Sequence, residues 1–395
     1  MPSAEPGLAD VLELIPAYVD EVVLQTVRDT HDAWTTRAYG AVNTATHGAA
    51  AGAEQLHRDI SGAVFGSLRL GLRAGSVATS VLGGLSRGRG LTGRRAATVH
   101  SALNGLLGDR FELEQSRLSI AMSVRRDGRD VLLDDSSLRA AFPEATDRVV
   151  VFLHGLGEHD EHWSRQRDRR GSTYAETLAA QGWTPVMLRM NTGLSLRENG
   201  AALAGLLQDL YDAWPSRPRR IALVGHSMGG LIARAGCAVA TANATAGATT
   251  QPWQGALSDV ITLGTPHLGA DLARAVGFGS QHLARLPETA AFGRLLDVRS
   301  VGIVDLGLGL RELEAHPGVR HRLVSGSLPG RWGVLFGDAM VRRGSATGRD
   351  RRSDLFPDAE VLHLEGVGHL DLLNHRDVDL ALSRWLADPW DDGRA

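Results

Sequence analysis

The sequence centres on residues 220–233, which read RIALVGHSMGGLIA. Residues 221–224 form a short, fully apolar run, as a strand buried on both faces would. A G-x-S-x-G motif follows directly at residues 225–229, and apolar residues that favour a helix come next. Glycines at both ends of the motif permit a turn so tight that Cβ atoms would not fit there. This strand–turn–helix context predicts that Ser227 is a nucleophile in a strained backbone conformation, the alternative being an ordinary glycine-rich turn.

Length and composition indicate a globular protein without a nucleic-acid partner. The 395 residues predict one large domain with an extension, or two domains. Hydrophobic residues make up 43% and charged residues 22%, and the formal net charge of −3 argues against nucleic-acid binding. Cys237 is the single cysteine, so no internal disulfide can form, and we expect a buried thiol.

The N-terminus shows no targeting signal. It carries acids and prolines where a signal peptide needs basic residues and an apolar core. No apolar run in the sequence is long enough to cross a bilayer. We therefore expect a cytoplasmic protein.

Residues 1–115 differ in composition from the rest of the chain. Apolar residues recur there at helical spacing, and Ala- and Gly-rich segments with few strand signals follow, which predicts a helical N-terminal region. Residues 60–108 contain several arginines but no Asp or Glu. Such a cationic stretch can make peripheral contact with a membrane or lipid surface. The alternative is a helical hairpin that packs on the main domain with its arginines in solvent.

From about residue 116 to residue 390 the pattern alternates between strands and helices. Asp127 and Gly128 lie between two strand-like runs and predict a β-hairpin, while Ser195 and Glu198 form a capping box that predicts a helix start. Other strands are predicted at residues 148–153, 185–189, 221–224, 260–263, 321–325 and 360–364, with a polar loop at 241–254 and a last helix at 378–386. This alternation predicts an α/β fold with a mostly parallel, doubly wound sheet.

A serine nucleophile needs a base and a group that orients the base. On a sheet of this kind the chain order is serine, then acid, then histidine, so both partners should follow Ser227. His369 comes just after the last predicted strand, at the edge where open α/β folds place their sites, and is the predicted base. Asp338, in the loop after the strand at 321–325, is the predicted acid. The alternative acids are Asp305, Asp354 and Asp371.

Negative charge that develops on a substrate oxygen requires backbone N–H donors. Met228 follows the nucleophile and is predicted to be one donor of this oxyanion hole. The other is predicted at Leu156, in the loop HGLG (residues 154–157) after the first buried strand. Glycines on both sides of Leu156 let the backbone approach a substrate closely.

Together these motifs resemble the lipases and esterases of the α/β-hydrolase superfamily. The resemblance rests on HGLG (154–157), GHSMGG (225–230), LGTPHLG (263–269), the Asp338 loop and VGHLDLL (367–373), and it covers about residues 118–390. Within this superfamily, the motifs resemble most those of bacterial lipases and GPI-inositol-deacylase-like proteins. In such relatives the GTPHxG segment frames the site and a cap or lid commonly follows, which places a cap here at about residues 268–318. Many of them read GDG-[LM]-V-P at the acid, whereas residues 337–342 read GDAMVR.

The resemblance and the predicted triad imply an α/β-hydrolase domain at residues 116–390 that hydrolyses a carboxylic ester through an acyl-enzyme. Three leucines in the predicted cap, Leu306, Leu308 and Leu310, suggest a hydrophobic small-molecule ester. The same triad also serves acyltransferases, thioesterases and amidases. A different class of function is tethering to a membrane or granule through the N-terminal helices.

No cofactor and no metal ion is expected. Gly155 and Gly157 lack the rest of a dinucleotide fingerprint. Residues 158–162 (EHDEH) resemble a metal-binding cluster, but a solvated rim beside the HGLG loop is the favoured interpretation. The sequence does not predict the oligomeric state.

Overall fold

The structure is a computed structural model that describes residue 55 and residues 94–245, 251–270, 300–316, 318–330, 338 and 340–390. The chain divides into two compact units, and nearly all described residues belong to the unit that contains residues 97–273 and 300–395. Most of the predicted N-terminal region, including residues 60–93, lies outside the described residues, as do residues 271–299 of the predicted cap. Among the described helices, none has the length and apolar character needed to span a membrane.

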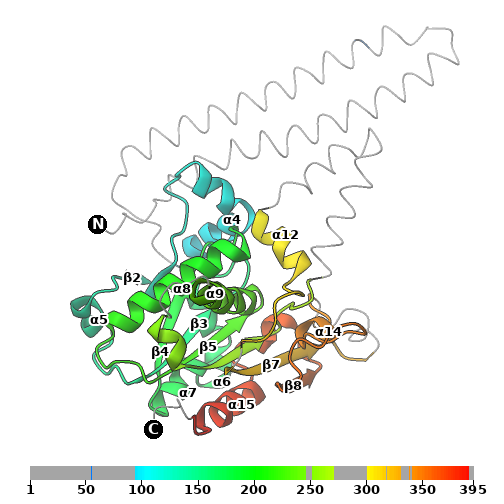
Figure 1. The fold of residues 1–395 in the computed structure, drawn as a ribbon. Coiled ribbons are helices and arrows are strands. Elements are labelled where there is room, and N and C mark those ends of the chain that lie inside the picture. The colour runs from blue at the N-terminus through cyan, green and yellow to red at the C-terminus, as the bar shows by residue number, and fades with distance from the viewer. Residues whose placement is uncertain are drawn as a thin grey trace, which may run out of the picture. The chain divides into compact units, whose positions relative to one another are not determined.

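An eight-stranded sheet with the order β2-β1-β4-β3-β5-β6-β7-β8 forms the centre of this unit (Figure 1). β1 is antiparallel to both of its neighbours, and the strands from β4 to β8 are parallel. The strands are β1 (Ser123–Arg126), β2 (Arg129–Val131), β3 (Arg148–Leu153), β4 (Thr184–Arg189), β5 (Arg220–His226), β6 (Leu257–Leu263), β7 (Arg320–Ser327) and β8 (Glu360–Glu365). This arrangement confirms the predicted α/β-hydrolase fold with a mostly parallel, doubly wound sheet.

The strand order fixes where a ligand site can form. From β3 the chain passes to β4 on one side and then returns to β5 on the other side of β3. The loops that leave β3 and β5 therefore diverge at the carboxyl ends of two adjacent strands. Open α/β sheets bind their ligands at such a switch point. Both the HGLG loop and Ser227 follow these two strands directly.

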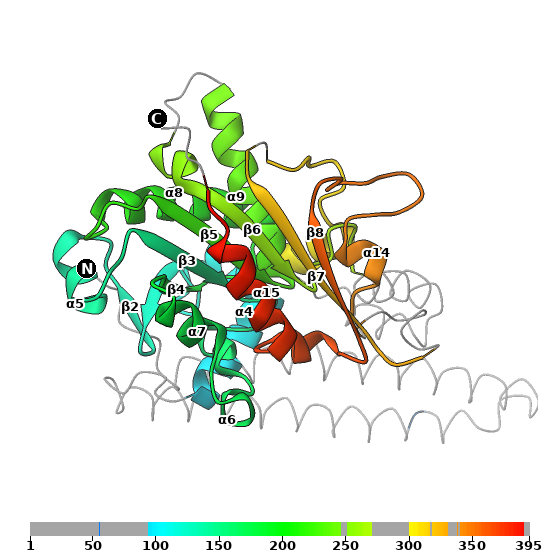
Figure 2. The same ribbon diagram turned by 90° about the horizontal axis from the view of Figure 1, so that it is seen from below.

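Helices cover both faces of the sheet (Figures 1 and 2). Helices α5, α8 and α9 contribute to the buried apolar cluster on one face, and α7 and α15 contribute to the cluster on the other. The described helices are α4 (Arg94–Leu113), α5 (Asp135–Ala141), α6 (Arg167–Arg170), α7 (Tyr174–Ala180), α8 (Leu196–Ala213), α9 (Met228–Thr245), α12 (Val301–Leu308), α14 (Arg343–Ala346) and α15 (Arg376–Ala387). Short 3-10 helices are η2 (Asp160–Ser164), η3 (Pro252–Ala256) and η4 (His369–Leu372).

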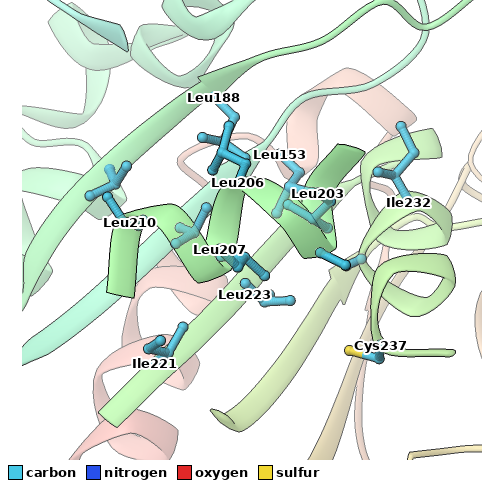
Figure 3. Packing of buried hydrophobic residues seen from close by; sticks show 14 of the residues in the cluster. Leu153, Leu188, Leu203, Leu206, Leu207, Leu210, Ile221, Leu223, Ile232 and Cys237 are labelled. Atoms are coloured by element: carbon cyan, nitrogen blue, oxygen red, sulfur yellow. The ribbon is translucent and has the colours of Figure 1, made fainter. Parts of the chain in front are cut away.

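The first of these clusters packs α8 and α9 onto the strands β3, β4 and β5 (Figure 3). Helices α8 and α9 approach each other closely because glycines lie at their contact: an added Cβ atom at Gly200 would lie 2.8 Å from Ala235, and one at Gly236 would lie 2.9 Å from Leu203. Cys237 is buried in the same cluster, as expected. Burial raises the pKa of its thiol to about 12, so the thiol is unreactive near neutral pH.

The predicted hairpin turn and helix start are confirmed, whereas the loop predicted at the end of α9 is wrong over its first part. Asp127 and Gly128 both have positive φ, at 50° and 73°, and form the predicted hairpin turn between β1 and β2. Ser195 and Glu198 form the predicted capping box of α8. The polar loop predicted at residues 241–254 is wrong over its first part, because α9 continues to Thr245. The hydroxyl groups of Thr241 and Thr245 donate to carbonyls one turn earlier, so these polar residues remain compatible with a helix.

A buried ion network joins the amino ends of the parallel strands. Asp259 is fully buried in β6, and its carboxylate accepts hydrogen bonds from Arg220 at 2.9 Å, from Arg320 at 3.1 Å and from Arg322 at 3.2 Å. Arg322 also donates to Glu360 at 2.9 Å, which extends the network to β8. The network therefore connects β5, β6, β7 and β8 at the end of the sheet opposite Ser227.

We expect Asp259→Asn to lower the free energy of unfolding by about 3–5 kcal/mol, because it leaves arginine charge without its buried counter-ion. Urea denaturation followed by circular dichroism measures the change. Asp358 is exposed and forms no hydrogen bond or ion pair with another described residue, so Asp358→Asn is the control and should stay within about 0.5 kcal/mol of the wild type. Equal stability of the two variants would contradict a structural role of the network.

Candidate active site

Ser227 lies on a sharp turn between β5 and α9, as predicted. Its φ is 52°, a backbone conformation that residues other than glycine rarely adopt. An added Cβ atom at Gly225 would lie 2.4 Å from the backbone nitrogen of Gly230, and one at Gly229 would lie 2.2 Å from the carbonyl oxygen of Leu153. Only glycine fits these positions, which is the reason for both glycines of the motif.

Hydrogen bonds to β6 and to the segment after it hold this turn in place. The backbone N–H of Ser227 donates to the carbonyl of Leu263 at 2.8 Å. The carbonyl of Ser227 accepts from the hydroxyl of Thr265 at 2.9 Å. Thr265 belongs to the GTPHLG segment, so this segment supports the strained residue directly.

Asp338 and His369 meet after β7 and β8. Nδ1 of His369 lies 2.8 Å from Oδ2 of Asp338, and both residues are buried. The other carboxylate oxygen of Asp338 accepts the backbone N–H groups of Met340 at 3.0 Å and Val341 at 2.8 Å. The backbone N–H of His369 donates to the carbonyl of Asp338 at 2.9 Å. The two loops are therefore locked together, and the carboxylate faces Nδ1 of the imidazole.

The second ring nitrogen of His369 has no hydrogen-bond partner among the described residues. Since Nδ1 faces a carboxylate and carries the proton, Nε2 presents a free lone pair. Gly264 leaves room for this ring: an added Cβ atom there would lie 3.0 Å from Nδ1 of His369. The ring of His226, the residue before Ser227, lies 4.8 Å from the ring of His369. The imidazole is thus next to the serine turn.

The HGLG loop lies against Ser227. An added Cβ atom at Gly155 would lie 3.0 Å from the Cβ atom of Ser227. The N–H of Gly155 donates to Glu158 at 2.7 Å, and the N–H of Gly157 donates to Thr192 at 3.0 Å. Between them, the N–H of Leu156 has no hydrogen-bond partner in the described part of the chain.

Met228 is the first residue of α9, so its N–H has no carbonyl one turn earlier within the helix. The N–H of Leu156 and the N–H of Met228 are therefore both available to an incoming oxygen atom. These are the two N–H groups that the sequence predicts as oxyanion-hole donors, and that role stays a prediction.

The other candidate acids lie in different surroundings. Asp305 accepts the backbone N–H of Leu196, Asp354 pairs with Arg349, and Asp371 accepts from Gln166. None of these three carboxylates forms a hydrogen bond with a described histidine.

The predicted solvated rim is wrong for residues 158–160, which are buried, whereas Glu161 and His162 are half-buried. Glu158 is 8% exposed, His159 2% and Asp160 9%. The carboxylate of Glu158 turns inward because it accepts from Gly155 and from Nδ1 of His226, at 3.0 Å. Within the described residues, no group of three or more His, Cys, Asp or Glu side chains is arranged to hold a metal ion.

His267 of the GTPHLG segment is also buried. Its Nδ1 accepts from Arg234 at 3.2 Å, and its Nε2 lies 3.1 Å from the hydroxyl of Thr262. Burial, with the charge of Arg234 adding to it, lowers the pKa of His267 well below the usual value. A neutral ring with both nitrogens occupied serves the structure of the loop.

Helix α4 packs on the HGLG loop, which the sequence did not indicate. An added Cβ atom at Gly105 would lie 3.1 Å from both Cα and the backbone nitrogen of Gly157. Asn104 fixes the helix by donating to the carbonyl of Leu118 at 2.7 Å, and its side-chain oxygen accepts the N–H of Ile120 at 3.1 Å. Helix α4 is thus a wall behind the loop that carries Leu156.

Part of the chain matches a known protein family. Residues 143–305 match the family described as "Putative serine esterase (DUF676)". That segment contains both the HGLG loop and Ser227. A sequence comparison with curated proteins found no relative of the chain.

Several solved structures have a similar fold. The mature lipase BlEst2 of Bacillus licheniformis is 22% identical, with 60% of this chain and 91% of that chain covered and a TM-score of 0.42. The esterase Pf2001 of Pyrococcus furiosus is 18% identical, with 62% and 84% covered and a TM-score of 0.39. The esterase RhEst1 of Rhodococcus sp. ECU1013 is 14% identical, with 69% and 100% covered and a TM-score of 0.37.

Residues 143–305 thus match a serine-esterase family, and the strand order is that of a mostly parallel α/β sheet. The two observations together support a serine hydrolase that acts on ester bonds.

The contact between Gly105 and Gly157 yields a test of the wall formed by α4. In Gly105→Ala the added methyl group must displace the HGLG loop by a few tenths of an ångström, so we expect kcat for an ester to fall about tenfold. Gly205 of α8 is exposed and has no atom within 4 Å of an added Cβ, so Gly205→Ala is a matched control.

The control should keep the wild-type kcat and gain up to about 1 kcal/mol of stability from the better helix former. Steady-state kinetics and thermal unfolding of both variants give the comparison. If Gly105→Ala is as active as Gly205→Ala, the wall does not position the loop.

Proposed function

We propose that this protein hydrolyses carboxylic esters through a Ser227–His369–Asp338 triad and an acyl-enzyme intermediate. The observation that carries the proposal is the 2.8 Å contact between Asp338 and Nδ1 of His369, beside a serine whose φ is 52°. The free lone pair of Nε2 suits it to accept the proton of the serine hydroxyl.

In the first half-reaction, His369 removes the proton from Ser227 while the serine oxygen attacks the ester carbonyl. Asp338 keeps the proton of the imidazole on Nδ1 and stabilises the imidazolium that forms. The N–H groups of Leu156 and Met228 donate to the oxyanion of the tetrahedral intermediate, and each donor of this kind is worth about 3 kcal/mol. His369 then gives its proton to the leaving alcohol, which departs.

In the second half-reaction, water replaces the alcohol. His369 takes a proton from the water, the resulting nucleophile attacks the acyl carbonyl, and Ser227 leaves with the proton returned to it. The acid is released and the enzyme regains its starting state.

The substrate class we propose is an ester with an apolar acyl or alkyl group. Supporting this are Val301, Val304 and Leu308, which are exposed and recur at helical spacing along one side of α12. The backbone of α12 is bonded both to Gly193, in the loop after β4, and to Ala270, after the GTPHLG segment. Of the three leucines in the sequence argument, Leu306 and Leu310 pack against the core instead.

Replacing the nucleophile tests the reaction. We expect Ser227→Ala to lower kcat for p-nitrophenyl esters by at least about 10³-fold, because the acyl-enzyme can no longer form. The control is Ser383→Ala, which removes a hydroxyl from α15 whose one side-chain hydrogen bond among the described residues comes from Gln181, and it should leave kcat unchanged. A Ser227→Ala variant with wild-type activity, or a wild type that hydrolyses no ester in a series of acyl chain lengths, would contradict the proposal.

Replacing the acid tests the orientation of the base. In Asp338→Asn the side-chain amide cannot accept the Nδ1 proton in the same way, so the imidazole takes the wrong tautomer; we expect kcat to fall by about 10³- to 10⁴-fold. Asp371→Asn is the control, because the Asp371 carboxylate accepts a hydrogen bond from Gln166 and forms none with Ser227, Asp338 or His369. A larger loss in the control than in Asp338→Asn would transfer the acid role to Asp371.

The choice between esters and related acyl compounds is tested on one acyl group. Hydrolysis of the p-nitrophenyl ester, the thioester and the anilide of the same fatty acid is compared for the wild type. For each compound, kcat/KM is divided by the rate constant of its uncatalysed hydrolysis. We expect this ratio to be highest for the ester. A higher ratio for the thioester or the anilide would show that the preferred substrate is a thioester or an amide and not an ester.

A further inference from the structure

Behind the triad lies a second pair of ionisable residues, Glu158 and His226. Glu158 is 8% exposed and His226 1%, and Oε2 of Glu158 lies 3.0 Å from Nδ1 of His226. Nε2 of His226 lies 3.3 Å from the backbone carbonyl of His369. The same Oε2 also accepts the N–H of Gly155 at 2.7 Å. The reaction sequence proposed above uses neither side chain.

The partners of its ring nitrogens indicate that His226 carries two protons. A carboxylate oxygen and a carbonyl oxygen can only accept, so each nitrogen of His226 must donate. Two other buried histidines provide a contrast. His154 places Nδ1 at the carbonyl of Gly155 but accepts the N–H of Met190 on Nε2, and His267 accepts from Arg234 on Nδ1. Each of these two rings has one nitrogen facing a donor and is therefore neutral.

The surrounding charges agree with this difference. Burial disfavours the charged ring of His226, but the carboxylate of Glu158, with a smaller contribution from Asp338, raises the pKa of His226 above its usual value. Burial lowers the pKa of His154. The groups that face His226 are Glu158, the backbone and ring of His369, Asp338 and the ring of Trp163. The positive charge of His226, and that of His162 when protonated, lower the pKa of Glu158 despite its burial.

The pair connects three segments that each carry part of the site. Glu158 binds the HGLG loop through Gly155, His226 immediately precedes Ser227, and the acceptor of the second ring proton belongs to His369. A charged hydrogen bond is stronger than a neutral one, and burial protects it from competition by water. The distances among the serine, the imidazole and the oxyanion donors therefore depend on this pair.

We propose that Glu158 and His226 form a buried carboxylate–imidazolium couple that positions the HGLG loop, Ser227 and His369 relative to one another. Both are positioning residues, since neither contacts the reacting atoms. The couple's effect on turnover rests on the proposed ester hydrolysis, but its protonation state does not.

The first test is kinetic and uses the full chain. Glu158→Gln keeps the shape of the side chain and removes its charge, and we expect kcat for a short p-nitrophenyl ester to fall about 10- to 100-fold with KM changed less than about threefold. Rates are expressed per active site titrated with a fluorophosphonate, so misfolded molecules are not counted. Glu144→Gln makes the same change at an exposed carboxylate that forms no hydrogen bond with a described residue, and it should match the wild type.

The pH dependence separates a charged couple from simple packing. In the wild type, kcat should fall at alkaline pH as His226 loses its second proton. In Glu158→Gln the counter-ion is gone, the pKa of His226 drops, and this alkaline loss should move to lower pH by at least about one unit. A loss at the same pH in both proteins would overturn the assignment of the couple.

The second test does not depend on turnover. Histidine labelled with ¹⁵N throughout the wild-type chain reports the protonation of each ring by long-range ¹H–¹⁵N correlation. We expect one buried ring other than that of His369 to carry protons on both nitrogens at pH 7.5, and the signal to be absent in His226→Gln. If every buried ring other than that of His369 is singly protonated at this pH, the couple does not exist, even if the protein hydrolyses esters. If the doubly protonated ring is found and no ester is cleaved, the couple stands and the proposed function fails.

Discussion

The positive φ of Ser227 is the constraint on which the rest of this site depends. A non-glycine residue in that conformation is unfavourable by roughly 1–3 kcal/mol and persists only where its surroundings impose it. Here β5 and α9 enter and leave the turn, Gly225 and Gly229 allow the neighbouring backbone to come within contact, and Leu263 and Thr265 bind the backbone of the serine. The serine is thereby presented at the switch point of the sheet, where the loop after β3 can reach it.

One end of the sheet contributes to stability, and the opposite end carries the candidate reaction site. At the amino ends of the strands, Asp259 gathers arginines from β5 and β7 into a network with every carboxylate oxygen occupied. At the carboxyl ends, His369 keeps one nitrogen without a partner in the described part of the chain, and the N–H groups of Leu156 and Met228 remain available. Polar groups left open in this way are unfavourable in a folded core unless a ligand completes them. The unpartnered Nε2 of His369 beside the strained Ser227 supports a reaction site at the carboxyl end.

The sequence predicted those parts of the molecule that short motifs specify. The turn at Ser227, the hairpin at Asp127 and Gly128 and the helix start at Ser195 each depend on a few adjacent residues, and each is present. Asp338 and His369 are 31 residues apart, and their pairing followed from chain order and their position after predicted strands.

Other features depend on contacts that no local pattern encodes. Glu158 reads as a surface residue in an EHDEH run, and only its approach to His226, 68 positions away, explains its burial. The contact of Gly105 with Gly157 is likewise invisible in the sequence, because a glycine in a helix gives no sign of its tertiary neighbour. The loop predicted at the end of α9 is wrong because the hydroxyls of Thr241 and Thr245 donate hydrogen bonds to carbonyls of their own helix. The histidine before the serine was the signal that could have revealed the Glu158 pair, since a buried imidazole needs partners for both nitrogens.

The central claim is that Ser227 is the activated nucleophile of this protein. The most direct measurement is covalent labelling with a fluorophosphonate, followed by digestion and mass spectrometry of the peptides. The account predicts one label, on Ser227, with labelling at least about 10²-fold slower in His369→Ala because the base that activates the hydroxyl is missing. A label on another residue, or an unmodified Ser227 after prolonged exposure to the reagent, would contradict it.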